Sequence, residues 1–175
     1  MMIVDKPPFL KILFLTARPK TLGASVAPVL MGTALAIREG EFHWGSALCA
    51  LAGAILIQIL TNYANDYFDF LKGADRENRL GPIRATSSGW LTQKQMQLAM
   101  VVLVLTSLIP GGYLIYRGGL PILVIGVVSL LLAFAYTAGP VPLAYMGFGD
   151  LFVLIFFGPV AVMGTYFVQA LHISW

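Results

Sequence analysis

Long apolar segments limit this chain more than any other feature of its sequence. A transmembrane helix needs about 20 mostly apolar residues, with a range of about 17–25. Five segments qualify, roughly residues 21–38, 45–64, 96–116, 119–137 and 150–170. Of the 175 residues, 58% are hydrophobic and 11% are charged, whereas a soluble domain carries about 25% charged residues. We therefore predict an all-α fold, a polytopic membrane helix bundle with about five transmembrane helices, with residues 1–175 forming a single domain in the lipid bilayer.

The distribution of Lys and Arg predicts the orientation of these spans. Arg38 and Arg117 lie on one side of the predicted membrane. The other basic residues precede the first span or lie between the second and third: Lys6, Lys11, Arg18, Lys20, Lys72, Arg76, Arg79, Arg84 and Lys94. Because cytoplasmic loops carry an excess of Lys and Arg, we expect the N-terminus and residues 70–94 to be cytoplasmic. The single cysteine, Cys49, lies in an apolar run and argues against a disulfide framework.

A stripe of polar residues follows the second apolar segment. Asn62, Asp66 and Asp69 continue the predicted helix, and Gln58 precedes them by about one turn. At about 100° per residue, Asp66 and Asp69 fall within about 40° of Asn62 on the helix surface. Polar and ionisable side chains at membrane depth usually face the interior of a bundle or a wet cavity, so this stripe indicates a functional site.

The residue types in and after the stripe favour magnesium and a diphosphate. Mg²⁺ is usually held by one or two carboxylates, while waters and substrate phosphates complete its coordination. Soft metals prefer Cys or His, and both histidines, His43 and His172, are predicted on the opposite side of the membrane. Basic side chains, which complement phosphate oxygens, follow the stripe at Lys72, Arg76, Arg79 and Arg84. This pattern indicates a Mg-diphosphate site for an amphipathic substrate.

Simpler interpretations of the same residues remain open. Asp66 and Asp69 could mark only the end of the second span, although acidic residues in phase with Asn62 are rare within membranes. Any cytoplasmic loop gathers Lys and Arg, so the basic residues alone identify no site. Asp150 is best explained as a carboxylate at the start of the fifth span. We expect the aromatic residues of that span to be packed or lipid-facing and not to form a substrate wall.

Residues 62–85, NYANDYFDFLKGADRENRLGPIRA, resemble the first Asp-rich motif of the UbiA superfamily of intramembrane prenyltransferases. They are most similar to the branch that prenylates 1,4-dihydroxy-2-naphthoate in menaquinone synthesis. Residues 17–36, ARPKTLGASVAPVLMGTALA, and residues 136–170 resemble the same branch, so the likeness covers nearly the whole chain. The superfamily pattern is often Asn-x-x-x-Asp-x-x-x-Asp. Here the second acid is one residue early, with Phe70 in its expected place, and this spacing resembles the naphthoate branch.

The resemblance implies a fold, a cofactor and a reaction. The family is an all-helical membrane bundle, in which two Asp-rich motifs hold Mg²⁺ around a prenyl diphosphate. The implied Mg-dependent prenyltransferase moves a polyprenyl group from polyprenyl diphosphate to 1,4-dihydroxy-2-naphthoate, giving demethylmenaquinol, in the cell inner (cytoplasmic) membrane. It has no nucleic-acid partner. Carried over by position, the catalytic and metal-binding residues are Asn62, Asp66 and Asp69, and the diphosphate contacts are Lys72, Arg79 and Arg84.

The chain departs from the family pattern in one respect. It ends at Trp175 without a second acidic motif, since Asp150 alone does not make one. We expect these residues to be an N-terminal portion, inactive alone, whose site needs missing C-terminal helices or another chain.

Three alternatives to the naphthoate prenyltransferase stay open. One is another UbiA-type aromatic prenyltransferase. The second is a transporter or channel fragment with an intramembrane cation or proton relay at Asp66 and Asp69. The third is a CDP-alcohol phosphotransferase, whose pattern has Gly where Phe70 stands.

Overall fold

The computed structural model describes residues 6–73, 84–138, 147 and 149–173, and the regular elements within these residues are all helices. In chain order they are α1 (Phe9–Thr16), α2 (Pro19–Arg38), α3 (Trp44–Leu71), α4 (Gln93–Ala135), α5 (Gly149–Ile155), the π-helix η2 (Phe156–Val160) and α6 (Ala161–Ala170). The predicted all-α fold class is therefore confirmed. Helices α5, η2 and α6 follow one another without a gap and form the predicted fifth span.

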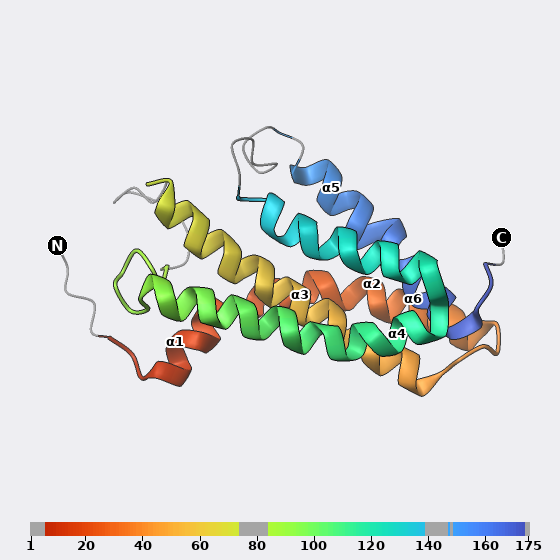
Figure 1. Cartoon of the computed structure of the whole chain (residues 1–175). Coiled ribbons are helices and arrows are strands. Elements are labelled where there is room, and N and C mark those ends of the chain that lie inside the picture. The colour runs from red at the N-terminus through yellow and green to blue at the C-terminus, as the bar shows by residue number, and fades with distance from the viewer. Residues whose placement is uncertain (1–5, 74–83, 139–146, 148, 174–175) are drawn as a thin grey trace.

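Four stretches within the described residues are long and apolar enough to cross a membrane: α2, α3, α4 and residues 149–170. Helix α4 has 43 residues, about twice the number that one crossing needs. It contains a break at Gly119, whose φ of 65° and ψ of −148° are not helical, and Figure 1 shows that α4 folds back on itself. Only glycine adopts such a conformation without strain. The two predicted spans 96–116 and 119–137 are thus the two limbs of α4.

The short helix α1 was not predicted, and it packs against α3 near the polar end of that helix. Its buried residues are Ile12 and Thr16, and the Tyr63 hydroxyl of α3 donates a hydrogen bond to the Leu13 carbonyl at 2.9 Å. Arg18 has a left-handed backbone, with φ of 51°, and Pro19 occupies the first position of α2. This change of direction between Arg18 and Pro19 lets α1 and α2 meet α3 at different angles.

The main core is centred on α3 and the first limb of α4, which lie side by side in Figure 1. Its buried side chains include Leu60, Tyr63, Tyr67, Met96 and Met100. On the other side of α3, α2 packs closely against α6: a Cβ added at Gly32 would lie 2.4 Å from the Val162 carbonyl oxygen. Many large apolar side chains stay exposed on the outside of the helices, as expected for a protein whose solvent is lipid. The chain is a multi-pass membrane protein.

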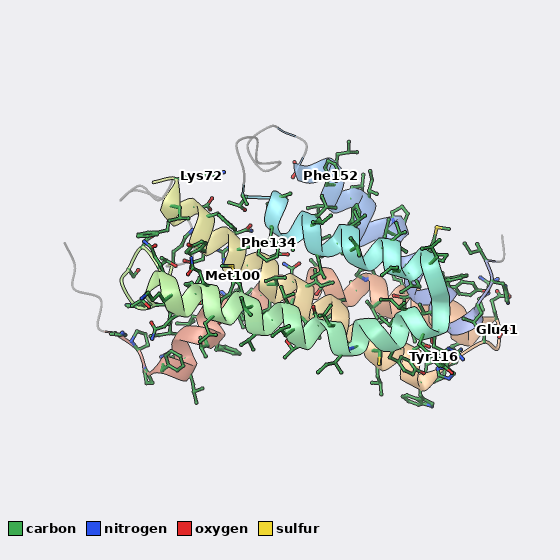
Figure 2. The ribbon with its side chains drawn as sticks, viewed as in Figure 1. Glu41, Lys72, Met100, Tyr116, Phe134 and Phe152 are labelled. Atoms are coloured by element: carbon green, nitrogen blue, oxygen red, sulfur yellow. The ribbon has the colours of Figure 1, made fainter. Side chains whose placement is uncertain are left out.

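The two ends of α3 differ in chemistry. Figure 2 shows Lys72 at one end of the molecule, and Glu41 and Tyr116 at the other. His43 caps the start of α3 by accepting a hydrogen bond from the Ser46 N–H, and His172 lies 3.6 Å from Glu41. The histidines therefore lie at the end of α3 opposite to Asp66 and Asp69, which agrees with their predicted separation from the polar stripe.

Candidate functional site

Helix α3 carries the whole polar stripe, because the helix continues beyond the predicted span end at residue 64 to Leu71. No Pro or Gly interrupts the sequence between Gly53 and Gly73. The helix ends just before Gly73, which has a φ of 62°. Asn62, Asp66 and Asp69 are all buried. Their common position on the end of one helix confirms the prediction that they continue the second span.

Asn62 connects α3 to the junction of α1 and α2. Its side-chain nitrogen donates to the Ala17 carbonyl oxygen at 2.8 Å and to the Thr21 hydroxyl at 3.0 Å. Both contacts use the amide nitrogen, so the amide oxygen is the atom that remains for a ligand. Asn62 therefore has a clear structural role in addition to any role in binding.

Asp66 contacts a segment that returns to α3 after the loop. Its Oδ2 accepts a hydrogen bond from the Ala85 N–H at 2.9 Å, and its Oδ1 accepts one from the Thr86 N–H at 3.1 Å. The side chain is deeply buried, with 2% of the residue exposed. Both carboxylate oxygens thus contact protein backbone in this structure, which the sequence pattern did not predict.

Asp69, one turn further along α3, forms an ion pair with Arg84. Both residues are buried. The Lys72 ammonium group donates to the Thr137 carbonyl oxygen at 2.6 Å, just beyond the end of α4. The structure therefore brings Asp69, Lys72 and Arg84 to the same end of the bundle, as the sequence predicted. Arg79 lies outside the described residues.

Asn65 is a residue that the sequence analysis left out of the stripe. Its side-chain oxygen accepts a hydrogen bond from the Thr137 hydroxyl, and its side chain lines a cavity. At about 100° per residue, Asn65 lies within about 60° of Asn62, on the same side as Asp69. Its spacing of four residues from Asp69 could have predicted Asn65 as a site residue. This spacing places two oxygen-bearing side chains one turn apart on the same helix face.

The cavity has a volume of about 330 Å³ and lies between α2, α3, the second limb of α4 and the α5–η2 segment. Its polar wall consists of Thr21, Ser25, Gln58, Thr61, Asn62, Asn65 and Ser129. The opposite wall is aromatic and includes Tyr136, Phe152, Phe156 and Phe157. Three of the fifth-span aromatics, which we expected to be packed or lipid-facing, thus line a cavity in the structure. They line it together with Leu132, Ala133 and Tyr136 from the end of the second limb of α4.

A second cavity of about 360 Å³ continues from the first toward the opposite end of the bundle. The two cavities share lining residues, among them Ala54, Ile57 and Phe156. The second is almost wholly apolar, with Leu108, Leu114, Ile122, Leu123 and Val168 in its wall. Together they form a mostly apolar space, and the polar side chains that line the first cavity include Asn65, one turn before Asp69 on α3.

The donor atoms at this end of α3 suit a hard cation in kind. They are carboxylate and amide oxygens, which Mg²⁺ prefers. The described residues contain no cluster of three or more His, Cys, Asp or Glu side chains that could hold a metal alone. Since Mg²⁺ usually takes one or two carboxylates and completes its shell with waters and phosphate oxygens, the residues fit a partial site that a diphosphate completes.

Comparison with known proteins gives one family. The model of the UbiA prenyltransferase family matches residues 25–175. Proteins named 1,4-dihydroxy-2-naphthoate octaprenyltransferase are among the similar sequences. The one from Escherichia coli is 41% identical over 159 residues, covering 87% of this chain and 52% of that protein. The one from Mycobacterium tuberculosis is 39% identical over 159 residues, covering 91% of this chain and 54% of that protein.

A more distant relative is the UbiA prenyltransferase domain-containing protein 1 of Dictyostelium discoideum. It is 33% identical over 174 residues, which cover 94% of this chain and 52% of that protein. The chain spans about half the length of the curated relatives it matches.

Proposed function

Since this chain belongs to the UbiA prenyltransferase family, we propose that it serves in an enzyme that transfers a polyprenyl group from polyprenyl diphosphate to 1,4-dihydroxy-2-naphthoate. The product would be demethylmenaquinol, an intermediate of menaquinone biosynthesis. The observation that carries this proposal is the mostly apolar cavity beside the end of α3, whose lining includes the side chains of Gln58, Asn62 and Asn65. The names of the bacterial relatives support the naphthoate acceptor.

The residues proposed to hold magnesium are Asp69 and the side-chain oxygens of Asn62 and Asn65. They share one side of α3, and their donor atoms are those that Mg²⁺ prefers. Asp66 is left out of this ligand set because its partners are two backbone N–H groups, whereas Asn65 and Asp69 accept hydrogen bonds from the Thr137 and Arg84 side chains, which can rotate toward a bound ligand. When bound, the ion would stabilise the negative charge that develops on the departing diphosphate.

Arg84 is the proposed diphosphate contact with the strongest structural support. Its guanidinium group is held beside Asp69, and a guanidinium can bind phosphate oxygens with two parallel hydrogen bonds. Lys72 lies at the same end, where its ammonium group donates to the Thr137 carbonyl oxygen. Arg79 is proposed from sequence alone. These cations would lower the energy of the transition state in which the allylic C–O bond breaks.

The two cavities would receive the organic parts of the substrates. The polar wall around Asn62 and Asn65 offers amide groups to the hydroxyls and carboxylate of the naphthoate, and the aromatic wall around Phe152 and Phe156 suits its ring. The apolar second cavity would take the polyprenyl chain. Its apolar walls bury isoprene units that would otherwise contact water. We propose that the site is completed by helices beyond these residues or by another chain.

The enzyme would lie in the cell inner (cytoplasmic) membrane, with its N-terminus in the cytoplasm. Lys6, Lys11 and Lys20 lie in or next to α1 and the start of α2, near the end of α3 that carries Lys72, whereas Arg38 and Arg117 lie toward the opposite end. This arrangement supports the orientation through the cytoplasmic excess of basic residues.

A direct assay tests the proposed reaction. Membranes that contain the full-length protein are incubated with magnesium, a polyprenyl diphosphate and 1,4-dihydroxy-2-naphthoate, and the lipid products are identified by mass spectrometry. We expect a prenylated naphthoquinol that has lost its carboxylate. Prenylation of 4-hydroxybenzoate without prenylation of the naphthoate would indicate another aromatic prenyltransferase. Cation uptake into vesicles with no prenyl transfer would favour a transporter.

A further inference from the structure

We propose that Asp66 is a positioning residue: its carboxylate caps the turn that begins at Arg84 and thereby holds the Arg84 guanidinium at the diphosphate site. We call its two hydrogen bonds, from the N–H groups of Ala85 and Thr86, the Asp66 cap. The part of the proposal that concerns diphosphate rests on the proposed function. The part that concerns the turn does not.

The turn at residues 84–91 needs a cap because of its hydrogen-bond pattern. The carbonyls of Arg84, Ala85 and Thr86 accept hydrogen bonds from the N–H groups of residues 88–91. The N–H groups of Ala85 and Thr86 point the other way, and the first N–H groups of any helical turn have no partner within that turn. A buried N–H without a partner is unfavourable. Asp66 satisfies both donors, one with each oxygen.

The negative charge of Asp66 suits this position. The N-terminal end of a helical turn carries partial positive charge, so an anion there is stabilised. Asp66 therefore acts as an N-cap that comes from a different helix, nineteen residues earlier in the chain than Ala85. Its burial at 2% exposure keeps water from competing for the two N–H groups.

The cap fixes the residue that precedes it. Arg84 directly precedes Ala85, and its side chain is buried against Asp69, one turn after Asp66 on α3. The backbone N–H groups of Ala85 and Thr86 are thus hydrogen-bonded to Asp66, and the preceding Arg84 side chain is ion-paired with Asp69 on the same helix. After the cap, Trp90 and Leu91 enter the main core, so the segment is held on both sides. Loss of the cap would leave Arg84 attached to a backbone that can move.

A metal ligand and a positioning residue at Asp66 predict different results when Asp66 is replaced. A metal ligand acts on the bound ion, so its loss should raise the magnesium concentration that binding requires. A positioning residue acts through Arg84, so its loss should weaken diphosphate binding only while Arg84 is present. Coupling of this kind appears as non-additivity in a double-mutant cycle.

The first measurement needs no catalysis. A spin label is placed at Ser88→Cys, in the turn, in a full-length protein whose other cysteines are replaced, including Cys49→Ala. A second label at Glu41→Cys, at the other end of the bundle, is the matched control. We expect Asp66→Asn to make the Ser88 label mobile and to leave the Glu41 label unchanged. An unchanged Ser88 label would overturn the proposal. If Asp66→Asn loosens both labels, Asp66→Glu takes its place and is judged by the same criterion, because it keeps the charge but moves the carboxylate.

The second measurement is the affinity for an unreactive prenyl thiolodiphosphate, by calorimetry at saturating magnesium. We expect Asp66→Asn to weaken binding by about tenfold, the scale of one lost hydrogen bond to a charged group. In an Arg84→Met background, Asp66→Asn should cause no further loss, and the magnesium midpoint should not move. An additive loss, which would mean that Asp66 acts independently of Arg84, would overturn the proposal. A raised magnesium midpoint, which would mean that Asp66 is a metal ligand, would also overturn it. If the wild-type protein binds no prenyl analogue, the proposed function fails, while the label measurement still decides the cap.

Discussion

The guanidinium group of Arg84 forms a buried ion pair with the carboxylate of Asp69, fifteen residues earlier in the chain. Arg84 is 6% exposed and Asp69 8%. Removing one partner of a buried pair leaves the other charge without compensation, which is strongly unfavourable. The pair therefore joins the end of α3 to the segment at residues 84–91, and it places a cation and a carboxylate side by side where the diphosphate and its magnesium are proposed to bind.

Replacement of Arg84 by Lys tests whether this cation contacts the diphosphate. Lys keeps the charge but lacks the planar fork, so the exchange is not conservative at a bidentate contact. In the full-length enzyme we expect the KM for prenyl diphosphate to rise, or kcat to fall, by at least about tenfold, because a charge-assisted hydrogen bond is worth about 1.5–3 kcal/mol. The KM for the naphthoate should change little.

The matched control for this exchange is Arg38→Lys, at a side chain that is 79% exposed at the other end of the bundle. It should leave both kinetic constants unchanged. Wild-type kinetics in Arg84→Lys would show that Arg84 makes no bidentate contact with the diphosphate.

Asn62→Leu tests the structural role of the amide. This change leaves the Ala17 carbonyl and the Thr21 hydroxyl without their donor. Because both hydrogen bonds are partly buried, and such a bond contributes about 0.5–1.5 kcal/mol net, the thermal midpoint in detergent should fall by a few degrees. Thr106→Val is the control, since the Thr106 hydroxyl bonds only to its own helix. Equal midpoints for the two variants would contradict the role given to Asn62.

Gly32→Ala tests the close approach of α2 and α6. The added methyl group would lie 2.4 Å from the Val162 carbonyl oxygen and 2.8 Å from Thr165 Cβ. Small residues let membrane helices approach closely, so we expect a lower thermal midpoint. Gly126→Ala, where the methyl group meets nothing within 4 Å, should leave the midpoint unchanged or raise it, because Ala favours helix. A midpoint equal to wild type in Gly32→Ala would show that these helices can separate without cost.

The orientation can be tested by labelling intact cells with a thiol reagent that does not cross membranes. In a Cys49→Ala background, Glu41→Cys should react from outside, and Ser88→Cys should react only after the membrane is opened. Both residues are exposed in the structure, so a lack of reaction reflects sidedness. The reverse pattern would place the N-terminus outside the cytoplasm.

Much of the fold could be predicted because it depends on local composition. Each apolar segment specifies one crossing, although the predicted second span ends at residue 64 and α3 continues to Leu71. The joining of two spans into α4 could not be predicted in the same way. The sequence between them consists only of Arg117 and Gly118, and the reversal depends on the positive φ of Gly119.

The site was predictable in outline but not in detail. Helical periodicity places Asn62, Asp66 and Asp69 on one helix face, and the structure agrees. It does not reveal what each side chain contacts, because the partners come from distant segments: Ala17 for Asn62, Ala85 for Asp66 and Arg84 for Asp69. The Asn65 contact with Thr137 depends on the return of α4 to the end of α3, which only the tertiary structure supplies.

The most direct test of the account is the initial rate of prenyl transfer by full-length Asp69→Asn, with Asp150→Asn as the matched control. Asp150 is an exposed carboxylate in the first turn of α5. We predict that Asp69→Asn lowers the rate by about 100-fold or more, the scale on which loss of one electrostatic group acts. Asp150→Asn should keep the wild-type rate. Removal of magnesium should abolish turnover by both the wild type and Asp150→Asn. Wild-type turnover by Asp69→Asn, undiminished after magnesium is chelated, would contradict the account.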